Sequence, residues 1–227
     1  MFYMLDPYYL LLVVLPAVLL CGYAQAKVHS TYSRYSKVVS RRGLSGAELA
    51  QDIIRRLGLP VDVELIPGRL SDHYDPVNRV LRLSEGTFYS RSLAALGVAA
   101  HELGHAIQHA SNYVPLRIRN GIVPAVQLGS SISPLLILMG ILFRAYSLIN
   151  LAILIFSLVV FFRVITLPVE LNASRRALRI LSEGGYLEED ELPGAAKVLN
   201  AAALTYLADA LIAMMQLLYF LSLSRRR

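Results

Sequence analysis

The sequence predicts a mainly α-helical, multipass membrane protein with about four transmembrane helices and a small α+β domain. The chain of 227 residues is 56% apolar and only 17% charged, whereas soluble domains are about 45–50% apolar and about 25% charged. Its apolar residues fall into long stretches with little charge, and the segments between them carry helical and strand patterns. The composition therefore argues against a soluble enzyme and against a disordered chain.

The formal net charge of the chain is +6. In so apolar a sequence, basic residues beside apolar runs are more typical of topology signals at anionic lipid than of nucleic-acid contacts. The sequence therefore predicts a lipid bilayer as a partner and no nucleic acid. The one cysteine, Cys21, leaves no intrachain disulfide to expect. The oligomeric state is left open.

The first apolar stretch, 8–26, carries no charge and is long enough to span a hydrocarbon core of about 30 Å. Only Asp6 precedes it, so the basic region of a signal peptide is missing and an uncleaved anchor is expected. The positive-inside rule puts the N-terminus outside and the following segment in the cytoplasm. The basic residues that set this orientation are Lys27, Arg34, Lys37, Arg41 and Arg42.

Two further apolar stretches complete the predicted spans. Residues 121–168 contain only two charges, Arg144 and Arg163, and are expected to form a transmembrane hairpin with a tight turn near Arg144–Ser147. Residues 201–223 are apolar except for Asp209 and form either a fourth span or a helix that lines the site. Asp209 either pairs with Arg163 or lies near a metal site.

The remaining segments, 27–120 and 169–200, lie on one side of the membrane if the hairpin is correct, and together they can form one modest core. We expect 27–120 to be a catalytic domain and 169–200 to be a helix. Within 27–120 the patterns predict two helices and two strands. The helices are Ala47–Leu57 and Arg91–Ala110, and the strands are Val61–Ile66 and Val80–Leu83.

The second of these helices contains His101-Glu102-Leu103-Gly104-His105, an H-E-x-x-H motif. Histidines at i and i+4 lie about 40° apart around a helix, so both imidazoles can bind one ion. Glu102 lies about 100° from His101, where it can take a proton from a water at the ion without being a ligand. The motif predicts zinc bound by His101 and His105, with Glu102 as catalytic base. The competing interpretation is two partly buried histidines on an amphipathic helix.

A catalytic zinc site needs a third protein ligand and an open position. His109 follows on the same helix, but three ligands in a row along one helix converge poorly, so a packing role is favoured for it. Glu170 opens a helical run after the hairpin and should emerge on the same membrane face. Glu170 is therefore the preferred third ligand. The alternative for Glu170 is a first-turn glutamate that interacts with the helix dipole.

A resemblance to the YugP-type membrane zinc metallopeptidases of bacteria is carried by HELGHAIQHA, by DHYDPVNRVLRLSEGTFYSRSLAALGVAA before it and by PVELNASRRAL after it. These enzymes are gluzincins, distantly similar to HtpX and the CAAX-prenyl endopeptidases. The resemblance implies a gluzincin-like catalytic domain in which His101, His105 and Glu170 bind zinc and Glu102 is the base. Relative to the E-x-x-x-D pattern of HtpX-like proteins, Ser174 replaces the aspartate, which implies that ligand orientation comes from elsewhere.

Several residues are candidates for contacts with the substrate. An exposed strand edge beside the metal helix is where substrate backbone pairs in gluzincin-like sites, and Arg79–Leu83 is placed for that role. His73 and Asp75 lie in the loop before it, either near the substrate or in a turn. Three residues are candidates for stabilising the oxyanion, with Tyr206 preferred over Asn200 and Tyr113. Arg175 and Arg176 either hold a substrate carboxylate or Glu170, or are positive-inside residues.

The sequence thus predicts a membrane-embedded zinc endopeptidase that hydrolyses peptide or membrane-protein substrates through metal-activated water, with a role in membrane-protein quality control implied by resemblance. We expect it in the bacterial plasma membrane with its site on the cytoplasmic side. One alternative is an intramembrane protease, although 90–110 is only moderately apolar. Another is a non-catalytic zinc-binding scaffold or holdase. Structural zinc sites usually include cysteine, and Cys21 lies in the first span.

Overall fold

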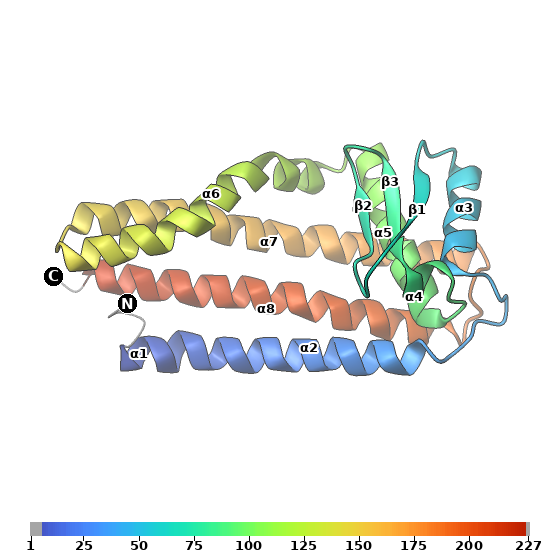
Figure 1. Ribbon diagram of the computed structural model, residues 1–227, viewed down its shortest axis with the longest axis horizontal. Helices are drawn as coiled ribbons and strands as arrows, with labels where there is room; N and C mark the ends of the chain where they lie inside the picture. The colour runs from blue at the N-terminus through green and yellow to red at the C-terminus, as the bar shows by residue number, and fades with distance from the viewer. Residues whose placement is uncertain (1–5, 226–227) are drawn as a thin grey trace. The chain divides into compact units, whose positions relative to one another are not determined.

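The computed structural model describes residues 6–225, which form long helices and one small sheet (Figure 1). Four of the described helices are long and apolar enough to cross a membrane, as the sequence predicts. The first is a continuous helical run of α1 (Pro7–Tyr9), the π-helical turn η2 (Leu10–Val14) and α2 (Leu15–Tyr35). The other three are α6 (Val114–Leu142), α7 (Tyr146–Glu183) and α8 (Leu192–Arg225).

The chain divides into two compact units. We call the first the membrane unit, which consists of the described residues of Met1–Gln25, Arg117–Pro168 and Leu204–Arg227. We call the second the helix–sheet unit, which consists of Ala26–Leu116 and Val169–Ala203. Each of the four long helices contributes residues to both units, because the boundaries fall inside the helices. The predicted mainly α-helical membrane protein with a small α+β part is confirmed.

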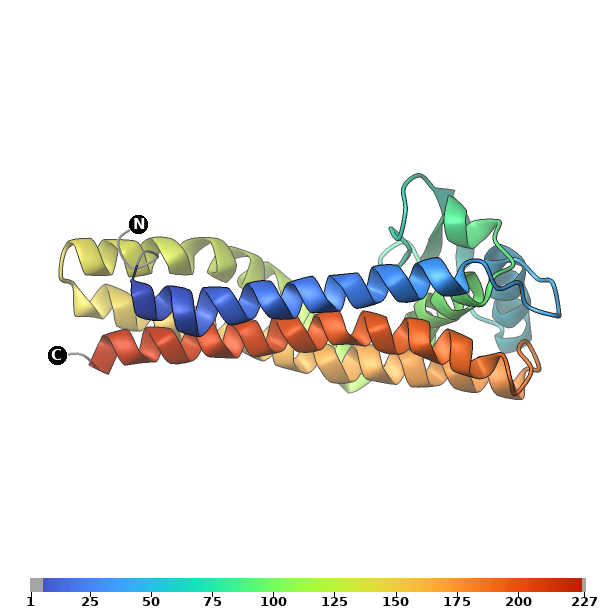
Figure 2. The same ribbon diagram turned by 90° about the horizontal axis from the view of Figure 1, so that it is seen from below.

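In the membrane unit, both views show α1–α2 and α8 side by side (Figures 1 and 2). The Tyr219 hydroxyl donates a hydrogen bond of 2.6 Å to Asp6, and the Ser224 hydroxyl donates one of 2.6 Å to Asn150. The start of α1, the end of α8 and the start of α7 therefore lie at one end of this unit. The predicted tight turn between α6 and α7 is present, with Arg144 at a positive φ of 53°.

An ion pair joins two of the spans within the membrane unit. The Arg163 guanidinium on α7 lies 2.8 Å from the Asp209 carboxylate on α8, and the two side chains are 46% and 44% exposed. Of the two roles expected for Asp209, the structure thus shows the pairing with Arg163. In water a half-exposed pair contributes about 0–1 kcal/mol, but an unpaired charge in hydrocarbon costs about 2.5–3.5 kcal/mol.

We therefore expect Arg163→Leu to lower the free energy of unfolding in a lipid environment by about 2–3 kcal/mol, because Asp209 loses its partner in an apolar medium. The double variant Arg163→Leu/Asp209→Leu should recover most of this loss. Denaturation of the protein in lipid nanodiscs measures both effects. If Arg163→Leu unfolds with the same free energy as the wild type, the pair lies in water and not in hydrocarbon.

The helix–sheet unit contains the sheet, formed by β1 (Asp62–Ile66), β2 (His73–Asp75) and β3 (Val80–Ser84) in the order β1-β3-β2. β3 pairs parallel with β1 and antiparallel with β2. The central strand β3 is buried, as are Leu81 and Leu83 on it. β1 and β3 agree with the predicted strands. Arg79–Leu83, however, is not an exposed edge, because β1 and β2 cover its two sides.

The edge strand next to β3 is β2, although a loop containing His73 and Asp75 is predicted there from the sequence. The hydrogen-bonded register joins His73 to Arg82 and Asp75 to Val80, so both residues are strand residues. Three polar or half-polar residues, His-Tyr-Asp, carry no alternating apolar pattern. This is the physical reason why the strand is absent from the sequence prediction.

Helices α3 (Gly46–Leu57), α4 (Glu85–Phe88) and α5 (Leu93–Ala110) pack against the sheet. α3 starts at a capping box in which Ser45 and Glu48 satisfy each other's backbone N–H groups, and it ends at Gly58 in the left-handed conformation. The core of this unit packs α3, α5, the sheet and the end of α7 together. Its fully buried side chains include Leu49, Leu81, Leu96, Leu103 and Leu181. Helix α5 is thereby fixed along nearly its whole length.

Candidate metal centre

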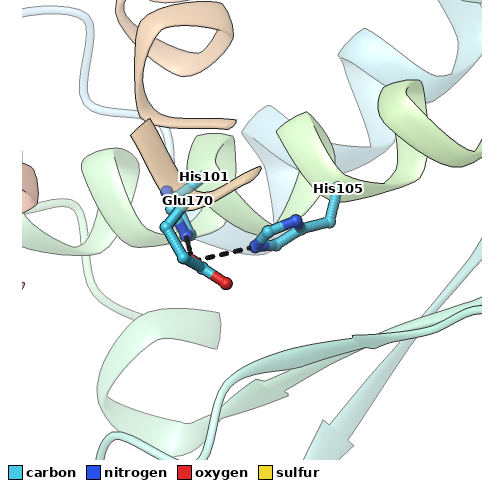
Figure 3. A group of neighbouring side chains, drawn as sticks. All are labelled: His101, His105 and Glu170. Atoms are coloured by element: carbon cyan, nitrogen blue, oxygen red, sulfur yellow. Dashed lines mark hydrogen bonds and ion pairs between the residues drawn. The ribbon is translucent and has the colours of Figure 1, made fainter. Parts of the chain in front are cut away.

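Two histidines and a glutamate converge in the helix–sheet unit (Figure 3). Their ligand atoms all lie within 4.8 Å of one another. His101 Nε2 is 3.2 Å and His105 Nε2 is 3.3 Å from the same oxygen of Glu170, Oε2. Both imidazoles thus direct the same ring nitrogen toward one carboxylate oxygen, as Figure 3 shows.

Helix packing brings these residues together. His101 and His105 lie one turn apart on α5, and Glu170 faces them from α7 with only 2% of its surface exposed. The helices approach closely because Gly104 has no Cβ, and an added Cβ would lie 2.6 Å from the Ala173 carbonyl oxygen. Glu170 is not a first-turn residue, since α7 runs without a break from Tyr146 to Glu183. The helix-dipole alternative for Glu170 therefore does not apply.

The distances from the two histidines to Glu170 fit zinc. A tetrahedral ion with ligands at about 2.0–2.1 Å holds them about 3.3–3.4 Å apart, close to the 3.2 and 3.3 Å that separate the histidine nitrogens from the Glu170 oxygen. Two imidazoles and one carboxylate are also the donor set that catalytic zinc sites use. Three protein ligands leave a fourth position for water or substrate.

Glu102 lies beside this group and is not one of its three members. Its Oε2 accepts a hydrogen bond of 3.1 Å from the backbone N–H of Tyr74 on the edge strand β2. Burial of the carboxyl raises the pKa of Glu102 above its ordinary value. A carboxyl in this environment has an increased affinity for a proton, which suits a group that accepts one and returns it.

Neutral side chains form hydrogen bonds with the Nδ1 atoms of both histidines, the ring nitrogens that do not face Glu170. The Ser174 hydroxyl lies 3.1 Å from His101 Nδ1, and the Gln108 carbonyl oxygen lies 3.0 Å from His105 Nδ1. The prediction that residues other than Ser174 orient the zinc ligands is therefore wrong for His101. A serine on α7 is long enough to reach the imidazole because Gly104 lets the two helices approach so closely.

Gln108 connects α5 to α7 and determines which tautomer His105 adopts. It is fully buried, and its amide nitrogen donates to the Val169 carbonyl at 2.8 Å and to Asn172 at 3.0 Å. Its oxygen must therefore face His105, so that His105 Nδ1 donates and Nε2 keeps its lone pair for an ion. Gln108 is not among the site residues predicted from the sequence. Its signal is a polar residue three positions after His105 on the same face of an otherwise apolar helix.

The two arginines on α7 do not hold Glu170. Arg176 donates a hydrogen bond of 2.8 Å to the Asn172 side chain, and its guanidinium lies 6.0 Å from the ring of Tyr113. Arg175 donates to the Leu171 carbonyl at 3.3 Å. Hydrogen bonds therefore connect His105 to Arg176 through Gln108 and Asn172.

Other candidates from the sequence lie outside the metal group. His109 Nδ1 bonds with the Tyr74 hydroxyl at 2.9 Å, in agreement with the packing role favoured for this histidine. Asp75 is held by Arg82 at 2.6 Å and accepts hydrogen bonds within its own turn. Asn200 is exposed on α8. Tyr206 belongs to the membrane unit, so its catalytic role stays a prediction.

We expect Ser174→Ala and Gln108→Leu each to weaken zinc binding by about 10–100-fold, because each removes the group that orients a histidine. Competition with a chromophoric zinc chelator measures this affinity. Ser182→Ala, an exposed serine on the same helix, is the matched control and should bind zinc like the wild type. Unchanged affinity in both orienting variants would show that the histidines are fixed by packing alone.

Comparison with known proteins agrees with this geometry. The family described as "Putative neutral zinc metallopeptidase" matches residues 9–225. The chain is 49% identical over 199 residues to the "Putative membrane protease YugP" of Bacillus subtilis (strain 168). The aligned residues cover 87% of this chain and 88% of the relative. No solved structure matches.

The family match extends over all four long helices and over the group formed by His101, His105 and Glu170. Zinc is the cofactor that the family implies, and the donor set and spacing of the group fit it. The chain therefore belongs to this family of neutral zinc metallopeptidases and is a membrane protein of that family.

Proposed function

We propose that the chain is a zinc-dependent endopeptidase in which His101, His105 and Glu170 bind the metal and Glu102 is the catalytic base. The observation that carries the proposal is the convergence of both Nε2 atoms on one Glu170 oxygen, at 3.2 and 3.3 Å, with both Nδ1 atoms already engaged. Such an arrangement is prepared for an ion before the ion binds.

Glu102 performs the proton transfers of this reaction. When bound, zinc supplies a Lewis acid that activates a water and polarises the substrate carbonyl. The Glu102 carboxylate takes a proton from the attacking water and delivers it to the leaving amine. The Tyr74 N–H holds this carboxylate in place through its 3.1 Å hydrogen bond. One buried carboxyl thus acts first as base and then as acid.

The substrate backbone binds along β2 in this proposal. β2 pairs with β3 on one side only, and its residue Tyr74 contacts Glu102 through the backbone. An extended peptide that adds to the free side of β2 gains main-chain hydrogen bonds next to the base. The edge expected at Arg79–Leu83 is thereby replaced by the edge at His73–Asp75.

The membrane topology follows from the charge pattern. Basic residues after the first span favour a cytoplasmic location for Ala26–Leu116. Within the membrane unit, the start of α1, the end of α8 and the α6–α7 turn lie at one end, so successive spans run in opposite directions. Val169–Ala203 then lies on the same side of the membrane as Ala26–Leu116. We propose a site on the cytoplasmic face of a bacterial plasma membrane, with membrane-protein quality control as the biological role.

The test is peptide hydrolysis by the purified full-length protein in detergent. We expect cleavage of internal peptide bonds in a quenched fluorescent peptide library, loss of cleavage with a zinc chelator and recovery on addition of zinc. Mass spectrometry of the products distinguishes internal from terminal cleavage. A protein that binds zinc in the expected group and yet cleaves none of the library would favour the scaffold or holdase interpretation.

A further inference from the structure

A pocket of about 390 Å³ lies in the helix–sheet unit, against the part of α5 that follows the H-E-x-x-H motif. Its walls come from the second half of α5, from the segment before β1 and from the β2–β3 hairpin. Pockets of roughly 300–1,000 Å³ accommodate small ligands, so this one has room for a single side chain or chain end. Its lining includes Tyr74, Arg79, Ala106, His109 and Asn112.

Two residues connect this pocket with the proposed catalytic group. Tyr74 contacts Glu102 through its backbone N–H and lines the pocket, and its hydroxyl bonds with His109 at 2.9 Å. His109 lies one helical turn beyond His105 on α5, a rise of about 6 Å. In an extended peptide, side chains two residues apart lie on the same side and are separated by about 6.6 Å. The pocket is therefore within reach of a side chain one or two residues from the scissile bond.

The pocket has one permanent positive charge, on the exposed side chain of Arg79, and no carboxylate of the described residues pairs with it. Among the described residues that line it, Arg79 is the one with a permanent charge. The acidic residue of the same hairpin, Asp75, is engaged by Arg82 at 2.6 Å and by Asn78 at 2.7 Å. No carboxylate of residues 6–225 forms an ion pair with Arg79. Asn112 adds a side-chain amide and His109 an imidazole to the lining.

The backbone at Arg79 is unusual for an arginine. Its φ is 55°, in the left-handed region that favours glycine and costs other residues about 1 kcal/mol. The hairpin would therefore be more stable with glycine at this position. Leu70, Asn112 and Arg144 share this backbone conformation, so the φ value alone assigns no function. It is the place of Arg79 in the pocket lining that points to one.

We propose that this pocket is a specificity subsite that binds a carboxylate of the peptide substrate through Arg79. The carboxylate is either an Asp or Glu side chain next to the scissile bond or the free C-terminus of the substrate. Guanidinium groups pair with carboxylates through two parallel hydrogen bonds, which discriminate against an uncharged amide of the same shape. This inference rests on the proposed peptidase function, because it assigns a substrate preference to that site.

The test uses the full-length, zinc-loaded protein and pairs of peptides that differ only by Glu against Gln. The Glu is placed in turn at each of the three positions on either side of the scissile bond. A parallel set ends at each position with a free carboxylate or with an amide. We expect kcat/KM to favour the carboxylate by about tenfold at one position. The set in which that preference occurs identifies the source of the carboxylate.

Variants at Arg79 separate charge from backbone effects. Arg79→Gly removes the guanidinium and relieves the positive φ, so the preference should disappear while the melting temperature does not fall. Arg79→Glu should reverse the preference. The matched control is Arg55→Gln, an arginine whose side chain is 77% exposed on α3, and it should keep the wild-type preference. A preference that survives in Arg79→Gly, or none at any position, would overturn the proposal.

A binding measurement keeps this test independent of catalysis. Fluorescence anisotropy of labelled Glu and Gln peptides gives their Kd values for Glu102→Gln protein, with and without Arg79→Gly. If the wild type cleaves no peptide, the peptidase function fails. Tighter binding of the Glu peptide that depends on Arg79 would still support the subsite, and equal Kd values for the two peptides would refute it.

Discussion

Glu102→Gln is expected to reduce kcat for peptide hydrolysis by about 10³-fold while zinc content and fold stay unchanged. The size follows from the contribution of a positioned general base, which is about 10²–10⁴-fold. The amide keeps the shape of the side chain, and its oxygen can still accept the hydrogen bond from Tyr74 N–H. It cannot accept a proton from water at neutral pH. Zinc stays bound because Glu102 is not among the three converging side chains.

The control for this variant is Glu189→Gln, an exposed glutamate in the α7–α8 connection. It makes the same chemical change outside the site and should leave kcat unaltered. Initial rates and zinc analysis on the same preparations provide both readouts. Full activity in Glu102→Gln would remove Glu102 from the reaction, and loss of zinc along with activity would make it a ligand or a structural support instead.

Glu170→Ala is expected to weaken zinc binding by more than about 100-fold, and therefore to abolish hydrolysis at ordinary zinc concentrations. The loss should exceed the 10–100-fold effect of removing an orienting partner, because a ligand itself is lost. It should also exceed the effects of Ser174→Ala and Gln108→Leu. Metal analysis after dialysis against a zinc buffer measures the affinity.

The matched control on the same helix is Glu183→Ala, whose side chain is 75% exposed at the end of α7. We expect this variant to retain zinc fully. Circular dichroism confirms that both variants keep their helices. If Glu170→Ala retains zinc like the control, the third ligand is another residue, and the arrangement of α5 against α7 is not what assembles the site.

The parts of this fold that the sequence predicts are those with strong local patterns. Uncharged stretches indicate the spans, and the i, i+4 spacing puts His101 and His105 on one face of α5. Glu170 can be inferred as a neighbour because the tight turn at Arg144 returns the chain to the same side of the membrane. The structure places all three side chains together.

The parts that the sequence does not predict depend on contacts between distant segments. β2 has three residues and no apolar alternation, so the sequence does not show that β3 is the central strand. α7 continues through Pro168, because long apolar helices tolerate proline where neighbours satisfy the backbone. Ser174 reaches His101 only because Gly104 allows the close approach of two helices.

X-ray absorption spectroscopy at the zinc edge of the purified, zinc-loaded protein identifies the ligands of the ion. We expect a single zinc with about four nitrogen and oxygen neighbours at about 2.0–2.1 Å and the multiple scattering of two imidazoles. Replacement of Glu170 by alanine should change the oxygen contribution or remove the metal. A sulfur neighbour at about 2.3 Å, a third imidazole, or no zinc under metal-replete conditions would contradict a centre built from His101, His105 and Glu170.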